Sequence, residues 1–245
     1  ITVYDLSVKC KILSCSVLYI PRMRPDAIIS AAVSLILSSK KDKYIICNGF
    51  KKDVYVENIA NMRNNGWENI IPVLSNMNEF DELDSCIKEP TKIGIRIASE
   101  EEPKFEFYTS RLGIRYRDIV PFYKEKIQGS KKFSLKMLHF FINTGIRDNA
   151  YYWNELAKCV NVYCDLKAIC PELDSLNIGG GFPIKSSLMH DYDYEYMAEE
   201  VISQIKSICQ QRGVNEPNIF TERKHNAAWL VYQMCFFEER AYNKP

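Results

Sequence analysis

The residues of this chain best suited to chemistry are three consecutive glycines, Gly179, Gly180 and Gly181, which directly follow a short apolar run. Backbone without side chains lets several N–H groups converge on one anion, most often a phosphate. An apolar strand, a glycine loop and then a helical stretch is the order found at phosphate sites of parallel α/β proteins. A plain tight turn explains the glycines equally well, so the rest of the chain must decide.

Further polar residues fall at or near the ends of apolar runs, where parallel α/β folds bind their ligands. These residues are Asn48, Arg96, Asn143, Thr144 and Glu222. Arg96 lies inside an apolar run, where an unpaired charge is costly, so we expect it to have an anionic partner. The others have simpler explanations: a turn at Asn48, a helix cap at Thr144, and a surface position for Glu222.

Taken together, these residues describe one kind of ligand. A glycine loop and the Thr144 hydroxyl suit a phosphate dianion, because charge-assisted hydrogen bonds are strong. A buried carboxylate at Glu222 suits a protonated ring nitrogen. A phosphorylated, nitrogen-containing ring is the chemistry of pyridoxal phosphate.

The elements that must position these residues alternate along the chain, which predicts a parallel sheet with helices outside it. We expect strands at residues 44–47, 70–74, 92–98, 135–142, 175–178 and 217–222, with a further candidate at 11–20. Between them we expect helices at residues 53–65, 78–86, 117–126, 149–170 and 192–212. The fold class is therefore α/β. An eight-stranded (β/α)8 TIM barrel is the natural closure and would be incomplete here, whereas an open doubly wound sheet is the alternative.

Composition excludes several classes of protein. The net charge of +1 over 245 residues argues against a protein that coats nucleic acid. Nine scattered cysteines, an odd number, indicate reduced thiols in a cytoplasmic protein rather than a disulfide framework. The three histidines, His139, His190 and His225, lack the spacing of a metal site. The apolar run at 27–37 is too short to span a membrane and is expected to be a core helix.

Six motifs occur in order along the chain: residues 46–50 (ICNGF), 92–99 (KIGIRIAS), 110–113 (SRLG), 137–145 (MLHFFINTG), 176–183 (LNIGGGFP) and 218–222 (NIFTE). Together they resemble the biosynthetic arginine decarboxylases, which belong to the barrel-fold pyridoxal-phosphate decarboxylases that also act on ornithine and diaminopimelate. The resemblance implies a TIM barrel of the alanine-racemase-like kind followed by a C-terminal β-domain. It also implies a homodimer, pyridoxal 5′-phosphate as cofactor, and decarboxylation of arginine to agmatine in polyamine biosynthesis.

The resemblance also assigns roles to the candidate residues. The three glycines correspond to the loop that binds the cofactor phosphate, and Thr144 falls where many relatives have a phosphate-binding serine. Glu222 corresponds to the carboxylate that keeps the pyridine nitrogen protonated, so that the ring can accept electrons. Arg96 matches an arginine under the cofactor. Phe141 stands where most relatives place a histidine against the ring, so it could stack but could not donate a hydrogen bond.

Both ends of the chain depart from the family. We expect three regions: an unmatched N-terminal segment at 1–42, a pyridoxal-phosphate-binding barrel domain at 43–222, and a divergent tail at 223–245. The motif of the Schiff-base lysine is not found before Lys43, and the C-terminal β-domain has no counterpart. The sequence therefore predicts a family segment that is truncated at both ends and inactive, or nearly so, by itself.

Two other functions stay open at this stage. The chain could be a non-catalytic barrel that binds the cofactor, or a regulatory partner of a full-length decarboxylase. It could also be an α/β protein whose glycines hold a nucleotide phosphate. Arginine as the substrate depends on the overall resemblance, because the residues that separate it from ornithine or diaminopimelate would lie largely in the β-domain.

Overall fold

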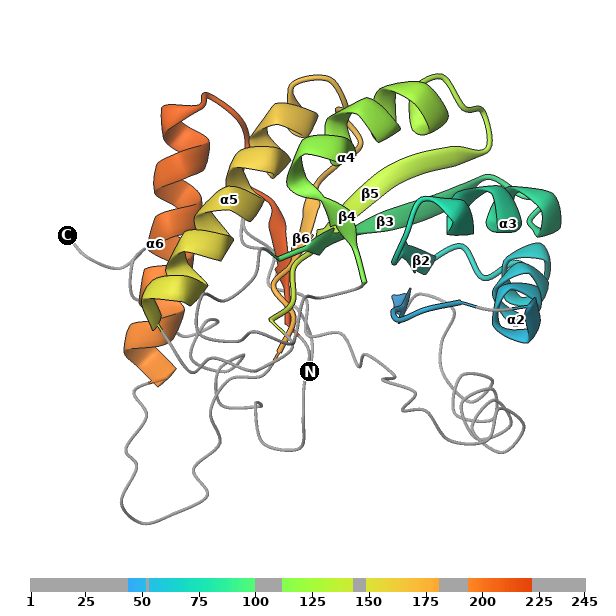
Figure 1. The fold of residues 1–245 in the computed structure, drawn as a ribbon, viewed down its shortest axis with the longest axis horizontal. Coiled ribbons are helices and arrows are strands. Elements are labelled where there is room, and N and C mark those ends of the chain that lie inside the picture. Colours follow the sequence, from blue (N-terminus) through green and yellow to red (C-terminus); the bar gives the residue numbers. More distant parts are fainter. Residues whose placement is uncertain (1–43, 52, 100–111, 143–148, 181–193, 222–245) are drawn as a thin grey trace, which may run out of the picture.

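A computed structural model describes residues 44–51, 53–99, 112–142, 149–180 and 194–221 (Figure 1). Strands and helices alternate along this part of the chain, as the apolar pattern predicts. The six expected strands and five expected helices from residue 44 onward are all present. The candidate strand at 11–20 and the candidate helix at 27–37 lie outside the described residues.

The strands form one parallel sheet in the order β1-β2-β3-β5-β6-β7, and a short strand β4 pairs with the end of β3. Their bounds are β1 Ile45–Cys47, β2 Ile70–Leu74, β3 Thr91–Ala98, β4 Ile114–Arg115, β5 Phe133–His139, β6 Ser175–Asn177 and β7 Asn218–Phe220. Every pairing is parallel. All the strands of the sheet therefore present their carboxyl ends to the same edge.

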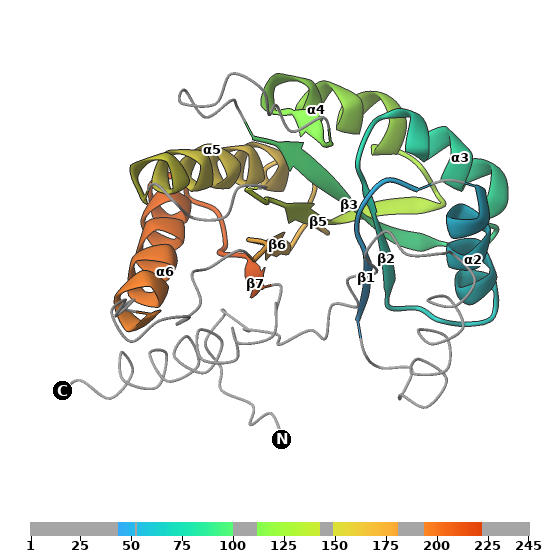
Figure 2. The same ribbon diagram turned by 60° about the horizontal axis from the view of Figure 1, so that its bottom comes forward.

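The helices lie along the outer side of this sheet (Figure 2). They are α2 Asp53–Asn64, α3 Asn78–Cys86, α4 Tyr116–Phe122, α5 Asn149–Lys167 and α6 Tyr194–Gln211, and a π-helix, η1 Tyr123–Ile127, continues α4. None of the helices in the described part of the chain combines the length and the apolar character needed to cross a bilayer.

The two faces of the sheet have different cores. Ile93, Ile95 and Ile97 of β3 are buried in the large cluster that packs under the helices. Because successive side chains of a strand point to opposite faces, Lys92, Gly94 and Arg96 belong to the other face. A second cluster forms there, of Ile46, Ile71, Val73, Met137 and Phe220. The inner face is therefore apolar at mid-height and polar at the carboxyl ends of the strands.

Strong curvature brings the two outermost strands together. The ring of Tyr44, directly before β1, lies 5.8 Å from the ring of Phe220 in β7, edge to face. In a flat sheet of this order the two strands would be five spacings apart, roughly 24 Å. With the helices outside, this curvature is that of an incomplete barrel. The barrel prediction is confirmed, and the open doubly wound alternative, with helices on both faces, does not fit.

One predicted boundary is wrong, and one predicted helix changes its type. The strand expected at 135–142 ends at His139, because beyond that point β3 pairs with β4 and β6 turns away at Gly179. The helix expected at 117–126 changes to a π-helix after Phe122; Pro121 inside it lacks the N–H that a regular helix uses.

Candidate functional site

Four residues meet at the carboxyl ends of β3, β5 and β6, which are neighbouring strands. The guanidinium carbon of Arg96 lies 5.4 Å from the centre of the Phe141 ring, and the His139 ring lies 6.3 Å from the same ring. A Cβ built on Gly179 would come within 2.9 Å of the Phe141 ring. Residues up to 83 positions apart along the chain thus form one cluster, which we call the rim cluster: Arg96, His139, Phe141 and Gly179.

Arg96 and His139 are buried and lie side by side on neighbouring strands. Arg96 is only 6 % exposed and His139 only 2 % exposed, and they are Cα partners in the β3–β5 pairing. A guanidinium over an aromatic ring is stabilised by the ring quadrupole, more strongly when water is excluded. The structure thus places Arg96 on the inner face near the cofactor candidate Phe141. The anionic partner expected for Arg96 stays a prediction.

The first glycine of the triplet is needed for its conformation and for space. Gly179 has φ +68°, a left-handed backbone that L side chains rarely adopt. Its N–H donates to Oδ1 of Asn177 at 2.9 Å, and an added Cβ would lie 2.7 Å from the Phe140 carbonyl oxygen. The chain therefore turns sharply at the end of β6, and no side chain fits between this turn and β5.

The carboxyl ends of β6 and β7 are paired with each other. Asn177 and Phe220 are Cα partners, and the Ile178 N–H donates to the Phe220 carbonyl at 2.9 Å. Gly179 and Gly180 thus follow β6 on the side of the sheet where the chain leaves β7 at Thr221. The candidates Thr144, Gly181 and Glu222, with Asn143, lie outside the described residues.

An ion pair that the sequence did not suggest lies at the same edge. The Lys51 Nζ, after β1, donates to Glu79 Oε2 at 3.2 Å, to the Gly49 carbonyl at 2.9 Å, and to the Val73 carbonyl. Glu79 in α3 also accepts the backbone N–H groups of Lys51 at 3.0 Å and Ser75 at 2.8 Å. Both side chains are 1 % exposed or less. The pair ties the loop after β1 to the loop after β2.

Electrostatics at Lys51 connect it to the rim cluster. Burial lowers the pKa of Lys51 below its usual 10.5, the Glu79 carboxylate opposes this effect, and the nearby Arg96 guanidinium adds to the lowering. Because all three ammonium protons have acceptors, Lys51 is held as a structural cation. Within the described ranges, Lys51 is the lysine in a loop that follows the carboxyl end of a sheet strand. Its amine is already hydrogen-bonded to Glu79 and to two backbone carbonyls.

A sequence signal for Glu79 was available. Asn76 precedes Glu79 by three residues, the spacing of a capping box. In the structure the Glu79 N–H donates to Asn76 Oδ1 at 3.1 Å, and Glu79 accepts from Asn76 Nδ2 at 3.4 Å. This signal predicts a helix start, but it does not reveal that the same carboxylate holds a lysine from another loop.

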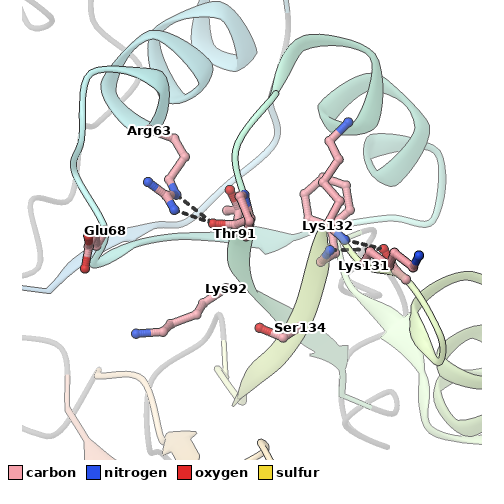
Figure 3. A pocket seen from close by; sticks show the side chains of 10 residues that line it. Arg63, Glu68, Thr91, Lys92, Lys131, Lys132 and Ser134 are labelled. Carbon is pink, nitrogen blue, oxygen red and sulfur yellow. Dashed lines mark hydrogen bonds between the residues drawn. The ribbon is translucent and has the colours of Figure 1, made fainter.

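A hollow of about 230 Å³ lies at the opposite, amino-terminal edge of β3 and β5. Arg63, Lys92, Lys131 and Lys132 give it a basic lining. Figure 3 shows Lys92 and Lys131 directed away from each other, so these charges do not converge on one point. The hollow is thus separate from the rim cluster and is not a site for a single anion.

The fold and the rim cluster define a class: a parallel (β/α) barrel domain with a polar ligand site at the carboxyl ends of its strands. The chain belongs to the family described as pyridoxal-dependent decarboxylase, pyridoxal binding domain, whose model matches residues 29–223.

Named relatives agree with this family. A biosynthetic arginine decarboxylase of Geobacter sp. (strain M21) is 28% identical over 207 residues, which cover 78% of this chain and 32% of that protein. The crystal structure of the biosynthetic arginine decarboxylase SpeA from Campylobacter jejuni has a TM-score of 0.60 at 23% identity, covering 79% of this chain and 33% of that one. Diaminopimelate decarboxylase from M. jannaschii, solved with L-lysine, has a TM-score of 0.65 at 18% identity, over 79% and 46%. The two structural likenesses show the fold. The chain spans about a third of the length of the curated relatives it matches.

The described residues fit the cofactor that this family binds. A phosphorylated aromatic ring needs backbone donors and cationic groups for its phosphate, and flat apolar surface for its ring. The rim cluster supplies the Gly179 turn and the buried Arg96 guanidinium, each next to the Phe141 ring. His139 adds an imidazole that the sequence-based roles did not include.

Proposed function

We propose that this chain is the cofactor-binding barrel segment of a pyridoxal-phosphate-dependent decarboxylase that converts arginine to agmatine. The observation that carries the proposal is the rim cluster, which joins Arg96, Phe141 and Gly179 at the carboxyl edge of the sheet. Family membership supports the cofactor. Arginine and the homodimer rest on the resemblance to the arginine decarboxylases.

Each residue has a proposed part in holding the cofactor. Gly179, Gly180 and Gly181 donate backbone N–H groups to the phosphate, and Thr144 adds its hydroxyl. Phe141 packs against the ring while Arg96 supplies positive charge beside it. Glu222 keeps the proton on the pyridine nitrogen. The bound cofactor supplies the electron sink for the bond that breaks as carbon dioxide leaves.

The inner apolar cluster shields the proposed cofactor site from water. The apolar layer of Ile46, Val73, Met137 and Phe220 closes the barrel below the site and excludes water from that side. In this low-dielectric setting the charge of Arg96 acts more strongly than it would in water. The site can therefore hold a charged ring in one orientation.

Pyridoxine 5′-phosphate is the suitable probe because it has the ring and the phosphate but no aldehyde to react with surface lysines. We expect saturable binding at one site per chain in isothermal titration. Arg96→Ala removes a charge-assisted contact of about 1.5–3 kcal/mol and should weaken binding about 10- to 100-fold. Arg117→Ala is the matched control, because Arg117 is 75% exposed and pairs with Asp118 on the surface.

The outcomes are distinct. Absence of saturable binding by the folded wild-type chain contradicts the proposed function. Equal losses in the Arg96 and Arg117 variants would show that net charge, not the rim cluster, governs binding. For turnover, we expect the chain alone to release no carbon dioxide from arginine, ornithine or diaminopimelate. Release from ornithine or diaminopimelate, but not from arginine, would contradict the proposed substrate.

A second candidate function is a non-catalytic cofactor-binding barrel or a regulatory partner of a full-length decarboxylase. The observation that favours it is Lys51: its amine is engaged by Glu79 and two carbonyl oxygens and is not poised for the cofactor aldehyde. Addition of the chain to an active arginine decarboxylase separates the two functions. A change in that enzyme's rate, with co-purification, supports the partner role, and no change supports the segment of an enzyme.

A further inference from the structure

We propose that Ser75, which directly follows β2, is a further binding residue of the site: its hydroxyl donates a hydrogen bond to the 3-oxygen of the cofactor ring. No motif of the sequence draws attention to this serine, and none of the roles proposed above uses it. The inference rests on the proposed function, because it adds a contact to the same cofactor.

The Ser75 hydroxyl is buried and lacks a partner. Ser75 is 0 % exposed, and within the described part of the chain its Oγ has no hydrogen-bond partner. Its backbone groups, in contrast, are both engaged. The N–H donates to Glu79 Oε2 at 2.8 Å, and the carbonyl accepts the Gly113 N–H at 2.6 Å. A buried hydroxyl without a partner costs free energy, and a ligand that bonds to it would remove this cost.

The register of the strands puts Ser75 at the height of the rim cluster. Ser75 follows Leu74, whose Cα partner is Ile95, so the next residue across on β3 is Arg96. The same register continues through β5 and β6. We call the four buried residues at this height the polar row: Ser75, Arg96, His139 and Asn177.

The polar row belongs to the inner face of the barrel. Each member directly follows a residue that is buried in the helix-side cluster: Leu74, Ile95, Leu138 and Leu176. Because successive side chains of a strand point to opposite faces, the members of the row face inward. Phe220, the Cα partner of Asn177, is itself part of the inner apolar cluster, which agrees with this orientation.

The order of groups along the carboxyl edge indicates which end of the cofactor Ser75 would meet. Gly179, at the proposed phosphate site, follows β6, and Phe141 follows β5. Arg96 lies over the Phe141 ring from β3, and β2 is one strand further from the glycine turn. With its phosphate at Gly179 and its ring at Phe141, the cofactor would direct the ring edge remote from the phosphate toward β3 and β2. That edge carries the 3-oxygen.

The charges near Ser75 suit an anionic oxygen. The 3-oxygen of a protonated pyridine ring is acidic and readily carries negative charge. Lys51 and Glu79 balance each other at 3.2 Å, and Arg96 adds a positive charge on the strand next to Ser75. A hydroxyl can donate or accept, and hydrogen bonds to an ionised acceptor are the stronger kind. Ser75 is therefore a donor to the ring oxygen.

Two probes test this contact by isothermal titration. Pyridoxine 5′-phosphate carries the 3-oxygen, and 3-deoxypyridoxine 5′-phosphate lacks it. We expect Ser75→Ala to weaken binding of the first probe about 5- to 20-fold and to leave binding of the second nearly unchanged. Urea unfolding of the ligand-free protein should show no loss of stability, because the variant removes a hydroxyl that has no partner. A structural hydroxyl would give the opposite pattern.

Ser175→Ala is the matched control. Ser175 is also buried, but it begins β6 at the other edge of the sheet, and its Oγ donates to Asp174 Oδ1 at 2.7 Å. This variant should lose stability and keep its affinity for both probes. A second variant, Ser75→Cys, keeps a weak donor at the same position, so its affinity for pyridoxine 5′-phosphate should lie between those of Ser75→Ala and wild type.

The wild-type protein already provides a decisive comparison. It should bind pyridoxine 5′-phosphate at least 5-fold more tightly than the 3-deoxy probe, and equal binding of the two overturns the inference without any variant. Equal losses for both probes in Ser75→Ala, or no loss for either, also overturn it while the proposed function stands. If wild type binds neither probe, the proposed function fails and the role of Ser75 fails with it.

Discussion

At the scale of single residues, Gly179 shows how the backbone limits the chemistry at the site. Its left-handed φ of +68° and the Phe140 carbonyl, which would be 2.7 Å from an added Cβ, are two separate obstacles to a side chain. Gly213 has nearly the same φ, +64°, but nothing within 4 Å of an added Cβ. The two positions therefore separate conformational strain from steric overlap.

We expect Gly213→Ala to cost about 1 kcal/mol of unfolding free energy, the penalty of a left-handed alanine. Gly179→Ala should cost about 2–4 kcal/mol, because the turn must also shift away from β5. Urea unfolding followed by circular dichroism measures both values. Equal losses in the two variants would show that the close contact at Gly179 has no energetic weight. Weaker pyridoxine 5′-phosphate binding should accompany only the Gly179 change.

Cys47 determines part of the stability in alkaline solution. Burial raises the pKa of this thiol from 9.0 to about 11. The unfolded chain therefore releases the proton at lower pH than the folded chain, and the contribution is complete below pH 9 and lost as pH rises toward about 11. Two pKa units correspond to about 2–3 kcal/mol.

Cys47→Ala should therefore flatten the fall of unfolding free energy between about pH 9 and 11, measured by urea titrations at several pH values. Burial also raises the pKa values of Cys159 and Tyr116, so a residual slope of the same sign should remain. Cys86→Ala is the control, since Cys86 is only partly buried in α3. An unchanged slope in the Cys47 variant would contradict the buried thiol.

At the scale of elements, the alternation of apolar and polar residues was sufficient to predict the strands and helices from residue 44 onward. The helix Asn78–Cys86 has the predicted bounds, because the capping residues and the apolar face lie next to each other in the sequence. The end of β5 could not be predicted in this way. Residues 140–142 are as apolar as the strand itself, and only the departure of the neighbouring strands stops the pairing.

The residues of the candidate site likewise fall into those that the sequence could predict and those that it could not. The glycine turn and Arg96 could be predicted because each is locally unusual: three glycines in a row, and a charge within an apolar run. His139 was considered only as a metal ligand, and Lys51 looked like one of many lysines. Their roles come from neighbours 28 or more residues away, Glu79 for Lys51 and Arg96 for His139, which no local pattern reveals.

The start of α3 provides a test at this scale. Asn76 Oδ1 accepts the Glu79 N–H at 3.1 Å, so Asn76→Ala should cost about 0.5–2 kcal/mol, as the loss of a capping residue usually does. Asn58→Ala is the control. Asn58 makes an exposed side-chain hydrogen bond to Val54 within α2, and its removal should change stability by less than about 0.5 kcal/mol. Equal effects in a thermal unfolding experiment would exclude a capping role.

At the scale of the whole molecule, the curvature of the sheet makes the site possible. Arg96 near the end of β3, His139 at the end of β5 and the Gly179 turn after β6 can act on one ligand only if the carboxyl edge bends around it. The observation that shows the bend is the contact of Tyr44 with Phe220, which joins the first and last strands of the order. The energy of that contact therefore measures whether the curved form persists in solution.

A double-mutant cycle gives this energy. Tyr44→Leu and Phe220→Leu keep apolar volume but remove the edge-to-face geometry, so we expect a coupling of about 0.5–1.5 kcal/mol in urea unfolding. Phe122 lies in the helix-side cluster and Phe220 in the inner cluster. Phe122→Leu with Phe220→Leu should thus be additive within about 0.5 kcal/mol. Additivity of the Tyr44 and Phe220 changes would mean that β1 and β7 do not meet. A flatter sheet would separate Lys51 and Arg96 from Gly179, and the proposed cofactor site could not form.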